Sequence, residues 1–164
     1  MTARAAAAVA VVLAASGLAI PQSASGAQVW SQLVMSRNGN HWSDDLNRPL
    51  FDEGAALVPG DERTSTFYVR NQSGDRGVLE VSVRVPGSSG LAGREAFRLA
   101  LRGAGGWQRA DLDNGEPAIR MDLAKGAVQP ISVRIRLLPT ARNAAMDDSM
   151  SFTLHVRLTQ KTGA

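Results

Sequence analysis

Apolar and polar residues alternate with a period of two along most of this chain. The alternation is clearest in residues 79–85, 97–102, 131–137 and 152–158, and a shorter version contains Phe67 and Val69. Successive side chains of a β-strand point to opposite faces, so this period predicts strands with one buried face. No segment has a convincing helical period, although residues 142–148 could form one short turn. The sequence therefore predicts an all-β chain.

Turn-forming residues separate these runs and suggest how the strands are arranged. Gly, Pro, Asn and Asp gather at residues 58–61, 71–75, 86–90, 103–106 and 113–115. With further strands expected at 30–36 and 119–123, about seven strands with polar outer faces predict two antiparallel sheets packed together. A closed barrel is the alternative that the pattern leaves open. Residues 37–53 contain too much Asn, Asp, Gly and Pro for a strand.

The first 27 residues have the three parts of a cleavable secretory signal peptide. Arg4 provides a short basic region, residues 5–20 form an Ala-rich apolar run, and Ser25 and Ala27 place small residues at a cleavage site. Sixteen residues, half of them Ala, are short for a membrane span. We therefore expect residues 1–27 to be removed and residues 28–164 to form one exported domain, without a stable membrane anchor after cleavage.

Composition narrows the chemistry of the exported domain. The chain has no cysteine, which excludes disulfides, thiol catalysis, zinc–thiolate sites and a lipidated cysteine. The net charge is only +3, and the arginines are spread singly along the predicted strands. This spread is typical of a solvated face, so we expect no nucleic-acid partner.

One short motif resembles a known group of exported proteins. Residues 57–61 read Leu-Val-Pro-Gly-Asp, and residues 66–71 read Thr-Phe-Tyr-Val-Arg-Asn before a Ser/Gly/Asp turn. This pattern is similar to that of exported immunoglobulin-like proteins of Gram-positive bacteria, including TasA/camelysin-like matrix proteins and related actinobacterial surface proteins. The likeness covers residues 57–85 and implies an immunoglobulin-like β-sandwich. The metallopeptidase activity sometimes ascribed to camelysin has no matching metal-ligand motif here.

The loop at residues 38–45 holds the candidate contact residues for a ligand or partner, which are His41, Trp42, Asp44 and Asp45. His, Ser and Asp adjacent in one loop do not form a catalytic triad, because triad members must converge in space around an oriented base. Residues 111–116 do not fit a calcium loop, since that register places Ala110 and Leu112 at ligand positions. We expect a tight hairpin at Asn114-Gly115 instead. The prediction includes no catalytic residue, cofactor or metal.

Two further features concern binding and assembly. Trp42 lies among polar residues and could stack on a sugar ring, whereas Trp30 and Trp107 are expected in the core. The segment after the cleavage site is apolar enough to add a strand to another subunit, through Val29, Trp30, Leu33 and Met35. The alternative is that this segment forms the first strand of its own sheet.

Together these features predict a secreted, non-enzymatic structural or interaction protein of the cell surface or extracellular matrix. Its partners would be itself or another exported envelope protein, and it would be released or retained non-covalently at the envelope. A small carbohydrate- or cell-wall-binding module is the alternative, and it depends on Trp42.

Overall fold

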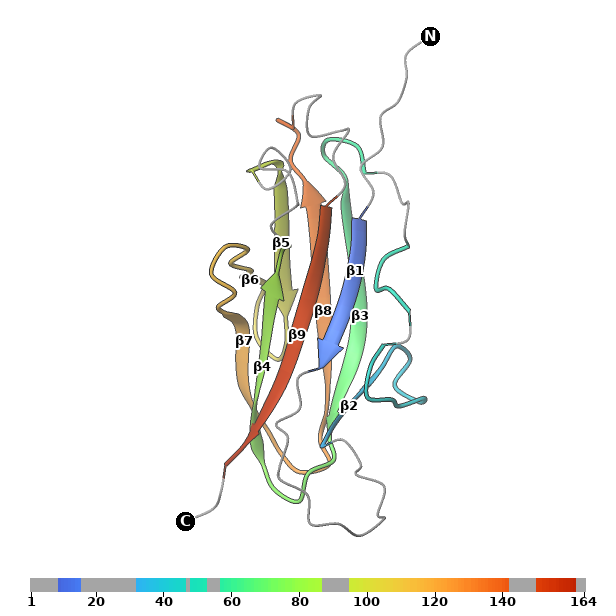
Figure 1. Cartoon of the computed structure of the whole chain (residues 1–164), viewed down its shortest axis with the longest axis vertical. Helices are drawn as coiled ribbons and strands as arrows, with labels where there is room; N and C mark the ends of the chain where they lie inside the picture. The colour runs from blue at the N-terminus through green and yellow to red at the C-terminus, as the bar shows by residue number, and fades with distance from the viewer. Residues whose placement is uncertain are drawn as a thin grey trace.

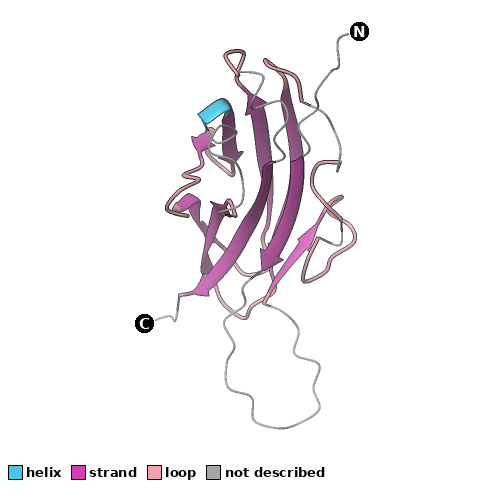
Figure 2. Ribbon diagram, turned by 45° about the horizontal axis from the view of Figure 1, so that its top comes forward, coloured by secondary structure: helices cyan, strands magenta, loops and turns pink. Residues whose placement is uncertain are grey.

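The computed structural model describes residues 9–15, 32–46, 48–52, 57–86, 95–141 and 150–161. Nine β-strands in these ranges form two sheets, with a single helical turn at residues 95–96 (Figures 1 and 2). The predicted all-β sandwich is confirmed, because the strands form two separate sheets and not one closed barrel. The described residues contain no helix long and apolar enough to cross a membrane.

The first sheet has the strand order β1-β9-β4-β7. Its strands are β1 (Val9–Ala15), β4 (Gly77–Arg84), β7 (Pro117–Leu123) and β9 (Met150–Gln160). β4 pairs antiparallel with both β7 and β9, whereas β1 pairs parallel with β9. The predicted antiparallel pairing is therefore confirmed for strands β2 to β9, and β1, which lies in the predicted signal peptide, adds one parallel pair.

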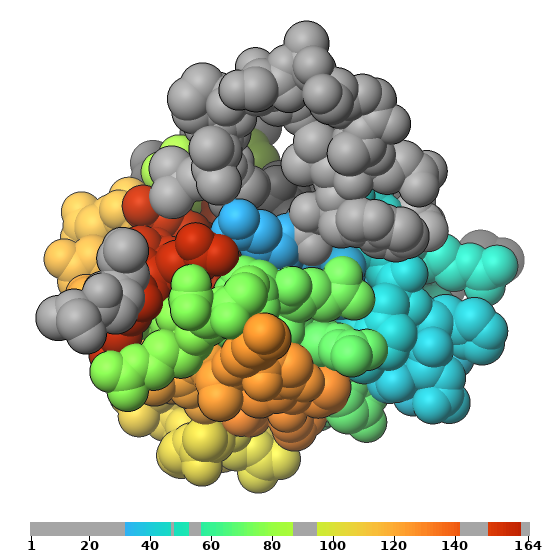
Figure 3. All heavy atoms as spheres, turned by 90° about the horizontal axis from the view of Figure 1, so that it is seen from below, coloured from blue at the N-terminus to red at the C-terminus, as the bar shows by residue number. Residues whose placement is uncertain are grey.

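The second sheet has the order β2-β3-β8-β5-β6, and all its pairs are antiparallel. Its strands are β2 (Leu33–Ser36), β3 (Glu62–Asn71), β5 (Phe97–Arg102), β6 (Gln108–Arg109) and β8 (Val128–Leu137). Seen end-on in Figure 3, β9 in red lies on the opposite side of the molecule from the yellow and orange residues of β5 and β8.

The core consists mainly of the apolar residues of the alternating runs. In β4, β5, β8 and β9 the apolar members of each run face inward, and Leu79, Phe97, Ile131 and Phe152 are all at most 4 % exposed. Phe51, from the loop after β2, adds to this core with its ring centroid 6.5 Å from that of Phe152. The core therefore joins both sheets and one irregular segment.

Most connections between consecutive strands cross from one sheet to the other. Of the nine described strands, six are each followed by a strand of the other sheet, namely β1, β3, β4, β6, β7 and β8. The Asn114-Gly115 turn therefore connects two sheets, and the predicted tight hairpin there is wrong. Asp111 holds this turn by accepting hydrogen bonds from the backbone N–H groups of Asp113 and Asn114.

Asn71 fixes another of these connections. It is fully buried at the end of β3, and its side-chain amide donates to the carbonyls of Asp75 (2.9 Å) and Leu123 (3.0 Å). Its side-chain oxygen accepts from the backbone N–H and the hydroxyl of Ser73. Asp61 acts similarly at the preceding turn, where its carboxylate accepts from the backbone N–H of Val58 and Gly60 has φ 95°.

β1 lies within the predicted signal peptide. Its seven residues pair with Met150–Val156 of β9, and Figure 1 shows it at the edge of the first sheet. This strand is the middle of the apolar run and contains Val9, Val11 and Val12, whose branched side chains favour extended backbone. Residues 16–31 and 142–149, which contain the expected cleavage site and the expected helical turn, lie outside the described residues.

Candidate functional site

The predicted contact loop at residues 38–45 is built on Ser36, the last residue of β2. The Ser36 hydroxyl accepts hydrogen bonds from the backbone of Asn38 and Gly39, and the Asn38 side chain accepts from the backbone of Asn40 and His41. Met35 and Ser43 exchange two backbone hydrogen bonds, of 2.7 and 3.0 Å, which close the loop. The loop is therefore an ordered excursion from the edge of the second sheet.

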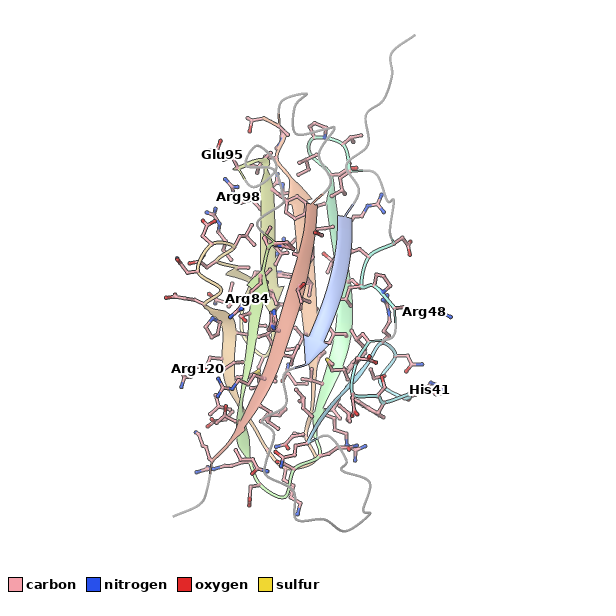
Figure 4. All side chains as sticks on the ribbon, in the orientation of Figure 1. His41, Arg48, Arg84, Glu95, Arg98 and Arg120 are labelled. Carbon is pink, nitrogen blue, oxygen red and sulfur yellow. The ribbon has the colours of Figure 1, made fainter. Side chains whose placement is uncertain are left out.

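The four predicted contact residues do not converge on one point. His41, Asp44 and Asp45 are exposed, and the His41 ring contacts the Asn38 side-chain amide at 3.0 Å. Trp42 is half-buried, and its ring centroid lies 5.9 Å from the Arg70 guanidinium. Figure 4 shows His41 and Arg48 projecting on this side of the molecule. No group of three His, Cys, Asp or Glu side chains suited to a metal occurs among the described residues.

A hollow of about 290 Å³ lies beside this loop and has a cationic rim. His41 and Trp42 line it together with Arg37 and Arg48. The Arg37 guanidinium donates to the carbonyls of Pro49 and Leu50 and thereby holds residues 48–50 against β2. The loop thus presents an indole and guanidinium groups, and its carboxylates lie outside the hollow.

The segment that was predicted to add a strand to another subunit instead contributes, in its described part, a strand to its own sheet. Leu33 and Met35 belong to β2, where they are buried in the second sheet of their own chain and pair with β3. Val29 and Trp30 lie outside the described residues. The two placed residues are therefore part of their own sandwich.

Arginines gather on the outer face of the second sheet. Their neighbours along each strand, such as Val69, Leu99, Leu101 and Ile135, are buried, so the alternation turns the arginines outward. We call this set the arginine face; it consists of Arg70 on β3, Arg134 and Arg136 on β8, Arg98 and Arg102 on β5, and Arg109 on β6. Strand pairing brings them together: Arg136 stands opposite Arg98, and Arg109 opposite Ala100, which also pairs with Arg134.

Trp107 packs on this face and not in the core, which corrects the sequence-based expectation. Its ring centroid lies 3.8 Å from the Arg134 guanidinium carbon and 4.8 Å from that of Arg102. Trp107 is half-buried in the short connection between β5 and β6. The indole therefore holds two guanidinium groups close together despite their like charge.

Little negative charge opposes these arginines. On the paired strands of this face, Glu62 is the acidic member, and its carboxylate contacts Arg134 at 3.4 Å. The outer face of the first sheet is different, since Glu80 contacts Arg120 at 3.4 Å and Asp122 contacts Lys161 at 2.7 Å. The outer face of the second sheet therefore has the larger excess of positive charge.

Two of these arginines have unused hydrogen-bonding capacity. The buried Nε atoms of Arg70 and Arg134 have no hydrogen-bond partner among the described residues. Each of these two guanidinium groups also lies over a tryptophan, Trp42 in one case and Trp107 in the other. The arginine face thus runs from one Arg–Trp contact near β2 to a second near β6.

A hollow of about 340 Å³ marks the β5 end of the arginine face. Arg98 and Arg109 line it, together with Asp111 and Asp113 from the connection after β6. Hydrogen bonds from the backbone and the side chain of Asn114 hold the pKa of Asp111 below its usual value. This end therefore combines the guanidinium groups of Arg98 and Arg109 with two carboxylates.

The sequence did not reveal this surface, although it gave the outward orientation of most of its members. Arg98, Arg102, Arg134 and Arg136 each occupy the polar phase of an alternating run. Their gathering depends on β8 lying between β3 and β5, which strand periodicity does not specify. The arginines are spaced singly along each strand, as the sequence shows, but strand pairing brings them together on one face, which was not expected from the sequence.

We compared the chain with protein families, curated proteins and solved structures. No family model matches the chain, and no curated protein matches it. Among solved structures, a family 123 glycoside hydrolase from Clostridium perfringens, analysed for glycolipid glycan hydrolysis, is similar over 64% of this chain. The identity is 9%, the TM-score is 0.28, and the match spans 22% of the hydrolase chain. A likeness at this level carries no argument.

Proposed function

We propose that this chain is a secreted, non-enzymatic interaction protein that binds an acidic polysaccharide at the cell envelope through its arginine face. The observation that carries the proposal is the gathering of six arginines on the outer face of the second sheet, where Trp107 packs on two of them and Glu62 is the acidic member of the paired strands. Binding would retain the protein at the envelope after the predicted removal of residues 1–27. This combines the predicted interaction protein with its wall-binding alternative.

The chemistry of guanidinium groups favours this ligand class. A guanidinium donates paired, charge-assisted hydrogen bonds to carboxylate or sulfate oxygens, and it stays ionised at every physiological pH. Arg98, Arg102 and Arg136 lie on neighbouring strands and carry such groups on one face. Adjacent strands lie about 4.8 Å apart, so the spacing suits the repeated charges of a sugar-acid polymer.

The flat outline of the site favours a polymer over a small molecule. The arginines are spread over four neighbouring strands, β3, β8, β5 and β6, and the hollow beside β5 is lined by only two of them together with Asp111 and Asp113. Small ligands are usually held in enclosed pockets, whereas extended chains bind along open surfaces. Trp42 and Trp107, one toward each end, can add contact with the apolar faces of sugar rings.

Retention on an immobilised acidic polysaccharide tests the proposal. The exported protein is passed over polygalacturonate and over neutral dextran, and the salt concentration needed for elution is recorded. We expect retention on polygalacturonate alone. The double variant R102Q/R136Q should bind about tenfold more weakly, because it removes two charge-assisted contacts. The control R84Q/R157Q removes the same charge from exposed residues of the first sheet and should bind as the unaltered protein does.

Three results would overturn the proposal. Equal loss in both double variants would show that net charge alone gives retention. Equal retention on neutral dextran, abolished by W42A, would assign binding to Trp42 without the arginine face. Stronger retention on duplex DNA than on polygalacturonate at matched charge would make the ligand a nucleic acid.

A further inference from the structure

The four sheet edges of the described sandwich differ in how they are protected against pairing with another chain. β2 has four residues and β6 has two, and such short edges offer few backbone groups. β7 carries Pro117, Arg120 and Asp122, which discourage the approach of another strand. The edge of β9 has a different kind of protection, because β1 covers it.

The part of β9 under β1 has the composition of a strand meant to be paired. The window Met150–Val156 contains no charged residue and no proline. Within it, Phe152, Leu154 and Val156 are at most 1 % exposed and alternate with Ser151, Thr153 and His155. Removal of β1 would leave seven residues of this edge without a neighbour, next to the core.

We propose that, once residues 1–27 are removed, β9 pairs antiparallel with β9 of a second copy along the edge that β1 covers. The two first sheets then form one continuous sheet with the order β7-β4-β9-β9-β4-β7. This inference depends on the predicted cleavage and is independent of polysaccharide binding. It gives the predicted self-association a defined surface.

The register that fits best is centred on Thr153. Phe152 then lies opposite Leu154 of the second copy, and Ser151 lies opposite His155, so like faces continue across the boundary. Arg157 falls outside the window in both copies, and no like charges face each other. A two-fold pairing also uses both free edges once, which closes the assembly as a dimer.

The length of the processed N-terminus argues against a donated N-terminal strand as the occupant. Leu33 begins β2 in the second sheet, which leaves residues 28–32 before it. Five residues cannot both reach a neighbouring copy and fill a window of seven pairs. The strand that a second copy can offer along its whole length is β9 itself.

The test uses the full chain expressed in a secreting bacterial host. The product is taken from the medium, its N-terminus is determined by mass spectrometry, and its mass in solution is measured by light scattering after gel filtration. We expect a processed dimer. T153K places two ammonium groups opposite each other and should weaken the dimer by about tenfold or more. T159K, on the same strand outside the window, should remain a dimer.

A second variant covers the case in which T153K fails to fold. The chain has no cysteine, so T153C should form an intermolecular disulfide under mild oxidation, whereas T159C should not. A processed protein that is monomeric at micromolar concentration would overturn the proposal, as would equal behaviour of the 153 and 159 variants. A product that retains Val9–Ala15, or a stoichiometric complex with a different protein, would overturn it as well.

Discussion

Arg134 and Trp107 form a close stacked pair on the outer face of the second sheet, with 3.8 Å between the guanidinium carbon and the ring centroid. The same guanidinium contacts the Glu62 carboxylate at 3.4 Å. The pair therefore joins the β5–β6 connection to β8, and Glu62 adds β3. One contact set thus connects three parts of the sheet and holds an arginine in a fixed orientation.

Replacing Trp107 by alanine should destabilise the protein and loosen the arginine face. The variant loses two cation–π contacts and the apolar cover over Arg134, which together contribute about 1–3 kcal/mol. Urea denaturation followed by circular dichroism measures the free energy of unfolding. W107F keeps an aromatic ring and should recover at least half of the loss. If W107A unfolds at the same urea concentration as the unaltered protein, the stack contributes nothing to stability.

Asn71 should be among the residues least tolerant of substitution. N71A removes four side-chain hydrogen bonds, three of them buried, and leaves the Leu123 carbonyl without this donor, which costs about 2–4 kcal/mol. The matched control is N114A, because Asn114 is exposed and its side-chain amide donates to the Asp111 carboxylate at the surface. Thermal denaturation should show a large decrease in melting temperature for N71A alone. Equal decreases in melting temperature would mean that the buried hydrogen bonds of Asn71 contribute no more to stability than the exposed hydrogen bond of Asn114.

The strands could be predicted from the sequence, because the alternation of apolar and polar residues within each strand shows which of its faces is buried. The runs around Leu79, Leu99, Ile135 and Leu154 alternate with period two, and each forms a strand. This information is local, since it depends on which side of a strand is apolar. It is sufficient for the fold class.

Strand order is not local, and the predictions that depended on it failed. The Asn114-Gly115 turn has the composition of a hairpin, yet β6 and β7 belong to different sheets. Arg98 and Arg136 are 38 positions apart in the chain and directly opposite in the sheet. The arginine face arises from such pairings, and Trp107 could not be assigned to it before the arginines were known to meet.

Gly77 should not tolerate even one added methyl group. A Cβ at this position would lie 2.8 Å from a Leu158 methyl carbon and 2.9 Å from the Thr159 carbonyl oxygen, which is part of the paired β9 backbone. G77A should therefore destabilise the fold by about 1–3 kcal/mol. G74A is the control, because no atom lies within 4 Å of its added Cβ, and it should change stability by at most about 0.5 kcal/mol. Urea denaturation of both variants measures the difference in stability. A G77A midpoint equal to that of G74A would show that β4 and β9 can separate to accept the methyl group.

His155 should make the stability of the fold depend on pH near neutrality. Burial, followed by the positive charge of Arg84, lowers the pKa of His155 below its ordinary value of 6.5. Between the folded and the ordinary pKa the unfolded chain binds more protons than the folded chain, so the free energy of unfolding rises with pH. The stability associated with the neutral His155 ring is therefore fully present above the ordinary pKa. It is lost as the pH falls from the ordinary pKa through the pKa of the folded state.

Urea denaturation between about pH 5.5 and pH 8 measures this dependence. The midpoint should decrease toward the acid end for the unaltered protein and decrease less for H155Q, which does not titrate. R84Q should lie between them, because it removes the repulsion that Arg84 exerts on the protonated ring and leaves the burial unchanged. The same slope in H155Q as in the unaltered protein would assign the dependence to other groups. A midpoint that increases toward the acid end would mean that folding favours the protonated ring, and it would contradict the placement of His155 beside Arg84 on the outer face of β9.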